Sequence, residues 1–337
     1  MRSVLALSAL LLWLTACGAP AGGGAAAPAG SPTGKTYRIG MVQQNTHPAL
    51  DAARKGAEEA LRESGLAVEI DAKNAQNDAA TLAAITDGFR DAKVDLVIAI
   101  GTQPLQAAYK SLQGSGIPIV FNTVTDPYAA GVAKSPTDHP GVTGIQALAP
   151  IQQAIDLILE FNPQTRRIGN IWTSNEKNSE VATRIAREYA QSKGLEFVER
   201  QVTRADEVLQ AAESLAAEGV DALFIATDST VVATLEAVVK VANENDIGLY
   251  CSDPSSAERG CVLGLGLDYY DNGYVSAKEM AIPILQGTDV SSIPIRKQEK
   301  NILVLNTAAA REQNVTIPEG IKSRADRVVD AITPKQQ

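Results

Sequence analysis

The sequence carries one pattern of strand-forming and loop-forming residues twice, and this repetition limits the folds that the chain can adopt. The segment RIGMVQQNT at 38–46 returns as RIGNIWTSN at 167–175, which is 129 positions later. The segment VDLVIAIGTQP at 94–104 returns as VDALFIATDST at 220–230, which is 126 positions later. A third pair, IPIVFN and IGLYCS, follows in the same order. Because a chain of 337 residues is long enough for two domains, we expect two lobes of similar design.

Each copy alternates short apolar runs with helical patterns. In the first copy YRIGMVQ, AVEIDA, VDLVIAI and IPIVFN indicate strands. Helical patterns are expected at 47–64, 79–90 and 105–112, and in the second copy at 180–191, 207–217 and 231–243. Strands that alternate with helices are typical of parallel sheets, and a continuously apolar run indicates a strand that is covered on both faces. The expected fold class is therefore α/β, with two Rossmann-like lobes.

Two such lobes placed side by side leave a cleft between them. In open parallel sheets, ligands bind beyond the carboxyl ends of the strands. Six loops follow those ends, at 43–47, 101–103, 122–126, 172–178, 227–230 and 252–254. The acid–hydroxyl cluster at 228–230 is one of these six loops, so it indicates a binding role rather than an isolated catalytic one.

The composition argues against several classes of function. The net charge is −9 and the isoelectric point is near 4.9, whereas nucleic-acid binding usually leaves a basic surface. His47 and His139 are the only histidines, and no His/Cys cluster has the spacing of a catalytic metal site. Neither a Gly-x-Ser-x-Gly elbow nor a phosphate-binding loop is found. We expect a binding protein without cofactor, metal or catalytic residues.

The first residues have the pattern of a secretory signal. Arg2 is followed by an apolar stretch from Val4 to Leu14, too short to span a membrane, and then by the small residues before Cys17. The four residues LTAC resemble a bacterial lipobox, which implies cleavage before Cys17 and a lipid on its thiol; an incidental cysteine is the alternative. Residues 18–35 are nearly all Gly, Ala, Pro and Ser, as in a flexible tether. The folded body is expected outside the cytoplasm, anchored by the lipid.

Several segments resemble one family. These segments are similar to those of ABC-transporter substrate-binding lipoproteins of the tryptophan/tyrosine-binding type, in the periplasmic-binding-protein type I class. They are RIGMVQQNTHPALDAARKGAEEAL, VDLVIAIGTQPLQAA, IPIVFNTVTDP, VDALFIATDSTVV and LGLDYYDNG. HPALDAA and TDST are the most distinctive parts. The resemblance implies a monomeric receptor that closes on a small solute and delivers it to an ABC permease in the membrane. Characterised relatives favour aromatic amino acids.

The resemblance also implies how the chain divides. Crossover strands near 142–146, 262–267 and 302–306 are expected to join the lobes, and a helix at 269–285 returns to the first lobe. The implied parts are a signal peptide (1–16), the lipidated cysteine with its tether (17–36), an N-terminal lobe (37–145 plus 269–301), a C-terminal lobe (146–268 plus 302–325) and a polar tail (326–337).

An amino-acid ligand needs a partner for each of its two charges. Its carboxylate suits the N–H groups at a helix start, and GTQP at 101–104 offers such a start together with the hydroxyl of Thr102. Its ammonium needs a carboxylate, and Asp228 and Asp253 follow strands of the second lobe; a charge-assisted bond of this kind is strong. The same residues can instead cap helices or turns, and both roles stay open.

Other residues at the strand ends complete the expected set. Trp172 is placed either to stack on an aromatic ligand or to lie in the core, and His47 either contacts ligand or is structural. The expected ligand contacts are Asn45, Thr46, His47, Thr102, Gln103, Thr123, Thr125, Asp126, Trp172, Ser174, Asn175, Asp228, Ser229, Asp253 and Asp268.

Cys251 and Cys261 are ten positions apart on neighbouring expected strands. In an oxidising compartment they can form a disulfide. They can also be two small buried thiols, because spacing alone does not determine the Cα geometry that a bridge needs.

The ligand and the purpose of binding it remain open at this stage. A sugar or another small solute is an alternative ligand, because a fold does not determine the solute. The loops carry few aromatic residues that would serve as sugar platforms, which favours a zwitterion. A receptor that reports its ligand to a membrane kinase is an alternative to transport.

Overall fold

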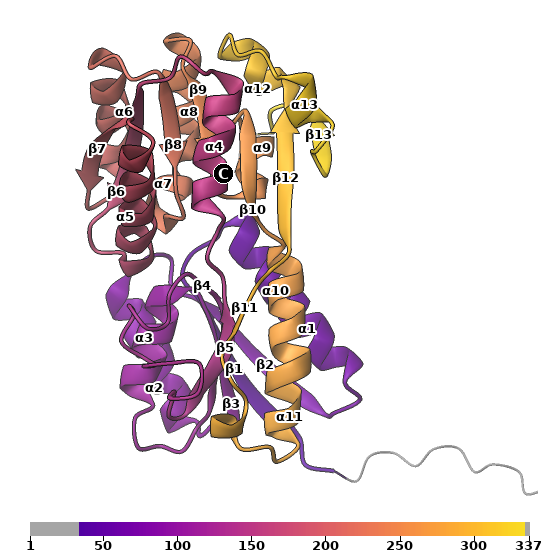
Figure 1. Cartoon of the computed structure of the whole chain (residues 1–337). Helices are drawn as coiled ribbons and strands as arrows, with labels where there is room; N and C mark the ends of the chain where they lie inside the picture. Colours follow the sequence, from indigo (N-terminus) through magenta and orange to yellow (C-terminus); the bar gives the residue numbers. More distant parts are fainter. Residues whose placement is uncertain (1–33, 334–337) are drawn as a thin grey trace, which may run out of the picture. The chain divides into compact units, whose positions relative to one another are not determined.

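The computed structural model describes residues 34–333 (Figure 1). The expected signal peptide, Cys17 and the tether up to residue 33 lie outside the described residues, as do residues 334–337. No helix within 34–333 combines the length and the apolar character needed to cross a membrane. The chain from Thr36 onward forms one unit, which we call the body.

The strands of the body form two sheets, as the repeat predicts. The first sheet has the order β11-β5-β4-β3-β1-β2, and all its pairs are parallel. The second has the order β13-β12-β10-β9-β8-β6-β7, and β10 against β12 is its antiparallel pair. We call each sheet with its helices a lobe. The strands are β1 Tyr37–Gln43, β2 Val68–Asn74, β3 Leu96–Ile100, β4 Ile119–Val124, β5 Val142–Gln146, β6 Arg167–Thr173, β7 Glu196–Val202, β8 Ala222–Ile225, β9 Gly248–Cys251, β10 Leu263–Leu267, β11 Arg296–Lys297, β12 Asn301–Asn306 and β13 Arg327–Val329.

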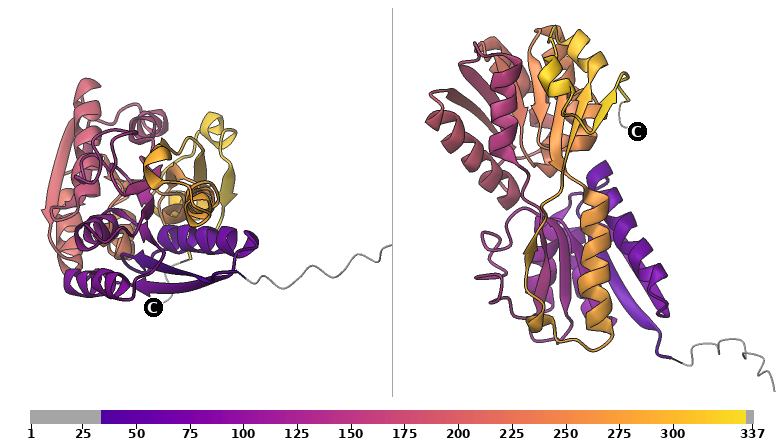
Figure 2. Two further views of the ribbon diagram at one scale, coloured as in Figure 1. Left: turned by 90° about the horizontal axis from the view of Figure 1, so that it is seen from below. Right: turned by 45° about the vertical axis from the view of Figure 1, so that its right-hand side comes forward.

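Helices cover both faces of each sheet (Figures 1 and 2). The first lobe contains α1 Pro48–Glu63, α2 Ala79–Asp91, α3 Thr102–Ser111, α10 Tyr269–Ser276 and α11 Ile282–Leu285, with a π-helical stretch Ala277–Ala281 between the last two. The second contains α4 Ile151–Phe161, α5 Lys177–Ser192, α6 Val208–Ala217, α7 Ser229–Ala233, α8 Leu235–Glu244, α9 Pro254–Glu258, α12 Thr307–Glu312 and α13 Glu319–Lys322. Short 3-10 turns lie at Ala205–Glu207 and Val290–Ser292.

Local residue chemistry explains where the helices near the strand ends begin. The expected helix at 105–112 starts earlier, at Thr102, because Gly101 has a φ of 105° and so makes the sharp turn out of β3 that other residues disfavour. The helix expected at 231–243 is two helices, and Thr234 separates α7 from α8. The side chains of His47, Asp228 and Asp253 each accept a backbone N–H at a helix start.

The chain passes between the sheets three times, directly beside the strands that were expected to cross. It leaves the first sheet after β5, returns at Asp268 after β10, and crosses again at 298–300 between β11 and β12. As expected, the helical segment from Tyr269 then packs in the first lobe, in one core cluster with Ile39 and Ile98. Helix α10 lies beside α1 (Figure 2), and Gly273 allows this approach because a Cβ there would overlap the carbonyl of Ala53.

The expected polar tail from residue 326 is wrong in part. Arg327–Val329 forms β13, which pairs in parallel with β12 at the edge of the second sheet. The backbone N–H of Asp326 donates to the Leu303 carbonyl at 2.9 Å, and the Leu303 N–H donates to the Asp326 carboxylate at 2.7 Å. The pattern was misleading because an edge strand is short and its charged side chains face solvent.

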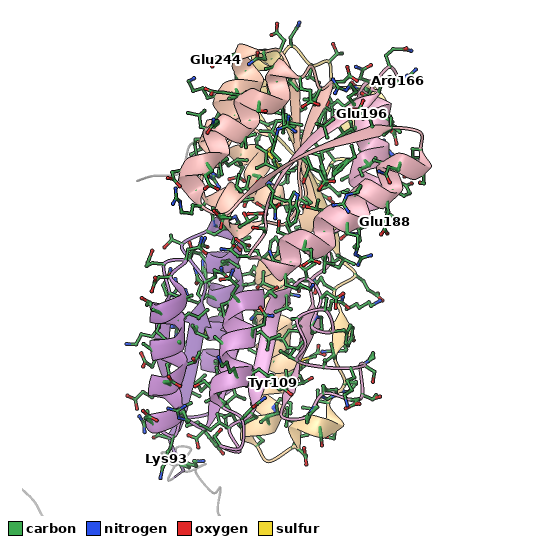
Figure 3. The ribbon with its side chains drawn as sticks, turned by 90° about the vertical axis from the view of Figure 1, so that its left-hand side faces the viewer. Lys93, Tyr109, Arg166, Glu188, Glu196 and Glu244 are labelled. Carbon is green, nitrogen blue, oxygen red and sulfur yellow. A yellow bond between two sulfur atoms is a disulfide. The ribbon has the colours of Figure 1, made fainter. Side chains whose placement is uncertain are left out.

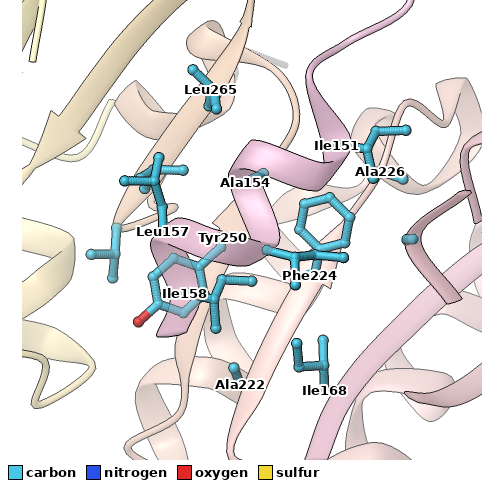
Figure 4. Close-up of a cluster of buried hydrophobic side chains, with 14 of the residues drawn as sticks. Ile151, Ala154, Leu157, Ile158, Ile168, Ala222, Phe224, Ala226, Tyr250 and Leu265 are labelled. Atoms are coloured by element: carbon cyan, nitrogen blue, oxygen red, sulfur yellow. The ribbon is translucent and has the colours of Figure 1, made fainter. Parts of the chain in front are cut away.

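Charged and apolar side chains separate in the way expected of a folded body. Lys93, Glu188 and Glu244 are exposed (Figure 3). In the second lobe, apolar residues of α4 pack on side chains of the sheet, and Figure 4 shows this cluster around Phe224 and Tyr250. Phe224 is fully buried. The cluster joins α4, which follows the first crossing, to strands of the second sheet, so the lobe is formed by distant parts of the chain.

Cys251 and Cys261 form a disulfide, with their Cα atoms 6.2 Å apart. Both residues are buried in the second lobe among apolar residues of the sheet and α8. The bond closes a loop that contains α9 and its capping residue Asp253. Of the two alternatives left by the sequence, the structure has the bridged one.

Candidate functional site

The carboxyl ends of strands from both lobes surround one cavity. Its volume is about 50 Å³. It is lined by His47, Ala49, Leu50, Gly101, Thr102, Thr123 and Thr125 of the first lobe, by Asn178, Thr227, Asp228, Ser229, Val232 and Asp253 of the second, and by Tyr269 after the second crossing. A larger hollow of about 600 Å³ is lined by first-lobe residues alone. The smaller one lies where ligands bind in open α/β sheets.

Hydrogen bonds join the two lobes around this cavity. The Asn45 amide donates to the Ser229 carbonyl at 3.2 Å, and the Asn77 amide donates to the Thr230 hydroxyl at 3.1 Å. On another side, the Gln103 amide donates to the Asn175 carbonyl at 3.3 Å. These bonds hold the two lobes together next to the cavity, whose wall includes Ser229.

The first-lobe wall contains buried hydroxyl groups that lack a partner. The side-chain oxygens of Thr102 and Thr125 are buried and make no hydrogen bond within the described residues. The two side chains are 4% and 1% exposed. A buried polar group without a partner costs about 1–3 kcal/mol. A ligand that accepts hydrogen bonds from these two hydroxyls would therefore be favoured. Thr123 lies between them with a φ of 58°, which is strained for a β-branched residue.

The carboxylate of Asp228 is already saturated by the protein. Its oxygens accept from the Thr173 N–H at 2.7 Å and hydroxyl at 2.9 Å, from Ser179 at 2.5 Å and from the Val231 N–H at 2.7 Å. Burial first, and then the nearby charge of Glu176, raise the pKa of Asp228 to about 7. Asp228 therefore lines the cavity and caps α7, but a ligand ammonium would have to compete with four donors.

Asp253 is less completely used. One carboxylate oxygen accepts from the Ser255 and Ser256 hydroxyls, both at 2.7 Å, and from the Ser256 N–H at 3.1 Å. The other accepts from the Ser255 N–H, at 3.3 Å. A carboxylate oxygen has about two acceptor positions, so this second oxygen keeps one for another donor. Burial, followed by the Asp253 charge, raises the pKa of Tyr269 above its usual range, which keeps that phenol protonated beside the cavity.

Glu176 is a buried residue of this region that the sequence reasoning missed. It is 1% exposed and accepts from the backbone N–H groups of Ser229 and Thr230, both at 2.9 Å. It also accepts from the Thr230 hydroxyl at 2.6 Å and the Asn178 amide at 3.1 Å. Its loop was recognised as a strand end. The signal in the sequence was an acidic residue in the loop that follows β6.

The remaining expected contacts do not line the cavity. Thr46 accepts from Asn74 at 3.1 Å, Asp126 accepts from the N–H groups of a turn, and Ser174 donates weakly to the Val202 carbonyl. Asp268 caps α10 and pairs with Lys300 at 3.1 Å. Asn45, Gln103 and Asn175 make the bonds between lobes that are described above.

Trp172 does not reach the cavity either. It is half-buried in β6, where its backbone is paired with Gln201. The next residue, Thr173, turns its hydroxyl to Asp228. Because neighbouring side chains of a strand point to opposite faces, Trp172 points to the other face of the sheet. Tyr269, the first residue of α10 after the second crossing, places its aromatic ring in the cavity wall.

Comparison with known proteins gives consistent matches over nearly the whole body. Residues 38–329 match the family of ABC transporter substrate-binding proteins. A tyrosine-binding protein of Clostridioides difficile (strain R20291) is 36% identical over 278 residues, which are 81% of this chain and 79% of that protein.

Two solved structures have a similar fold. A domain from Streptococcus pneumoniae in complex with L-Trp has a TM-score of 0.83 at 27% identity, covering 88% of this chain and 100% of that one. A ligand-free, open substrate-binding protein with adhesive properties from Clostridium difficile has a TM-score of 0.67 at 31% identity, covering 88% and 99%.

Proposed function

This chain belongs to the family of ABC transporter substrate-binding proteins, and from that premise we propose that it captures an aromatic amino acid in the cavity between its lobes. As a member of that family it is an extracytoplasmic receptor that supplies a small solute to an ABC importer. We further propose that it is a monomer anchored by a lipid on Cys17, on the strength of the LTAC pattern.

The observation that carries the proposal is the complementary chemistry of the two cavity walls. The first lobe offers the buried hydroxyls of Thr102 and Thr125, which can donate to a carboxylate. The second lobe offers the free acceptor position of Asp253, which can accept from an ammonium. Leu50 and the ring of Tyr269 also line the cavity, and both suit an aromatic side chain. An α-amino acid with an aromatic side chain has groups for all of these partners.

The comparisons support the same ligand class. One relative is a tyrosine-binding protein and one similar structure holds L-Trp. This chain matches the L-Trp complex with a higher TM-score than the open protein, although its identity to the open protein is higher. We attribute the lower score to the open lobes of that protein. Together with the bonds between lobes, it supports a closed arrangement that opens to admit ligand.

A thermal-shift and calorimetry panel tests the proposal. The purified protein would be mixed with L-tyrosine, L-tryptophan, L-phenylalanine, L-leucine and D-galactose. A ligand at 100 times its Kd stabilises by about 2.7 kcal/mol. We expect stabilisation by aromatic amino acids, and none by tyramine or 3-(4-hydroxyphenyl)propionate, because each lacks one of the two charged groups. Stabilisation by galactose alone, or equal stabilisation by tyramine, would overturn the proposed ligand class.

A matched pair of variants tests the cavity wall. Thr102→Val removes a cavity hydroxyl, whereas Thr165→Val removes a hydroxyl that is equally buried and unpartnered but lies away from the cavity. We expect Thr102→Val to weaken binding of the aromatic amino acid by about tenfold, the value of one hydrogen bond to a charged group. Thr165→Val should bind like the wild type. Equal affinities of both variants would remove Thr102 from the site.

A further inference from the structure

A directed row of hydrogen bonds runs from the first lobe into the second and ends on Glu176. The Gln44 amide donates to the Asn77 side-chain oxygen at 2.8 Å. The Asn77 amide donates across the lobes to the Thr230 hydroxyl at 3.1 Å. The Thr230 hydroxyl donates to Glu176 at 2.6 Å. Each group donates in the same direction, and the row ends on a buried carboxylate.

The carboxylate sets that direction. An ionised carboxylate can only accept hydrogen bonds, and a hydroxyl has a single proton. The Thr230 hydroxyl therefore donates its hydrogen bond to Glu176 and accepts one from Asn77. Because the Asn77 oxygen is occupied by Gln44, the Asn77 amide is oriented to donate. A residue at 176 that donated a hydrogen bond toward Thr230 would reverse the direction of this row.

Glu176 also orders the backbone that makes a second bond between the lobes. It accepts the N–H groups of Ser229 and Thr230. This holds the Ser229 carbonyl where the Asn45 amide of the first lobe reaches it at 3.2 Å. Two of the bonds that join the lobes thus depend on one side chain, and that side chain does not line the cavity.

The position of this carboxylate is costly. It lies close enough to the buried Asp228 for its charge to raise the pKa of that group, and two neighbouring buried carboxylates repel each other. A carboxylate suits this place because each of its two oxygens accepts two hydrogen bonds. A neutral amide would turn an N–H group toward two of these donors, so the acid holds the α7 start in a way that glutamine does not.

We propose that Glu176 is a positioning residue that latches the closed lobes through Thr230 and Ser229. It controls how long the ligand is held, and it makes no contact with the ligand. The inference rests on the proposed function, because a latch over this cavity presupposes a ligand captured inside it.

Ligand dissociation measures the latch. With L-tyrosine as probe, stopped-flow mixing would give the association and dissociation rates of wild type and Glu176→Gln. We expect dissociation about five- to tenfold faster with little change in association, as for loss of one hydrogen bond. Thr230→Val should behave alike, and Thr230→Ser, which keeps the hydroxyl, should restore the wild-type rate. A dissociation rate unchanged by both Glu176→Gln and Thr230→Val would overturn the latch.

A double-mutant cycle separates a latch from general loosening of the second lobe. Asn45→Ala/Asn77→Ala removes the first-lobe partners of both Ser229 and Thr230. If Glu176 acts through these two bonds, Glu176→Gln should have a much smaller effect in that background than alone. Additive effects would mean that Glu176 acts within its own lobe, and would overturn the proposal.

A measurement without ligand keeps the two proposals distinguishable. Nitroxide labels on Lys93→Cys and Glu244→Cys, with Cys17→Ser, report the distance between exposed sites on different lobes (both labelled in Figure 3). Because the bonds of the latch need no ligand, wild type should show a closed population that Glu176→Gln loses. If L-tyrosine fails to bind, the proposed ligand fails while this distance still tests the latch. The latch would be overturned if wild type shows no closed population, or if Glu176→Gln shows a closed population as large as that of wild type.

Discussion

The disulfide between Cys251 and Cys261 should contribute both to stability and to binding. Both cysteines are almost fully buried, so a reductant reaches the bond only after local opening. Substitution is therefore the cleaner perturbation, and we consider Cys251→Ala/Cys261→Ala. The bond closes a loop whose ends are ten positions apart, and Asp253 of the cavity lies inside that loop.

The expected loss follows from chain entropy. For a loop of about ten residues, a crosslink lowers the entropy of the unfolded chain by about 9 cal/mol/K, which is about 2.7 kcal/mol at 25 °C. The unfolding entropy is about 2.1 cal/mol/K per residue, which for the described residues 34–333 gives about 0.6 kcal/mol/K. The Tm should therefore fall by about 4 °C, and somewhat more because the missing sulfur atoms leave space in the core.

Calorimetry of wild type, the double variant and Cys251→Ala measures this loss. The single variant is the control: it also breaks the bond, so the two Tm decreases should be nearly equal rather than additive. The Kd for L-tyrosine should rise in both variants, because the loop that carries Asp253 is less constrained. Alkylation of both cysteines in the unreduced wild-type protein, or an unchanged Tm in the double variant, would refute this reasoning.

Further outcomes follow from other buried groups. The pKa of Asp228 is raised from 3.8 to about 7. Its contribution to stability is therefore fully present below about pH 4 and is lost as the pH rises through 7. The urea concentration at the unfolding midpoint should decline from pH 4.5 to 8 in wild type and decline less in Asp228→Asn. Arg259 is 4% exposed and pairs at 2.7 Å with Glu236, whose side chain is 37% exposed; Glu236→Ala should therefore lower the free energy of unfolding by about 2 kcal/mol, as for hydrogen bonds to a charged group, and a loss below 1 kcal/mol in urea would contradict this. Gly273→Ala forces a Cβ into the backbone of α1 and should lower the free energy of unfolding by about 3 kcal/mol. Gly88 is exposed with open space around it, so Gly88→Ala should raise the free energy of unfolding by about 0.5–1 kcal/mol. Similar Tm values for the two variants would count against the packing of α10 on α1.

The location of the candidate site could be predicted from the sequence, because strand ends are visible in it. Thr102, Asp228 and Asp253 follow apolar runs, and the carboxyl ends of parallel strands gather at one edge of a sheet. Which face each side chain takes was not visible. Trp172 precedes Thr173 by one residue, and that single step moves it away from the cavity side.

The roles of the acids depended on partners that are distant in the chain. Asp228 looked like an ammonium acceptor, but Thr173 and Ser179 use its oxygens. Glu176 looked like an ordinary loop residue, but α7 brings two backbone N–H groups to it. Hydrogen-bond satisfaction is a property of the assembled neighbourhood, so local sequence could indicate candidates without showing which oxygen remains free.

The sequence by itself determined the α/β class, the two lobes and the family, because apolar periodicity, turn residues and the repeat are all properties of neighbouring residues along the chain. Only the tertiary structure decided that Cys251 and Cys261 are bridged, that Arg327–Val329 adds a strand to the second sheet, and that Asn77 of the first lobe meets Thr230 of the second. Those contacts join positions far apart in sequence or depend on exact Cα geometry. Their energy exists only once the chain has brought both partners together.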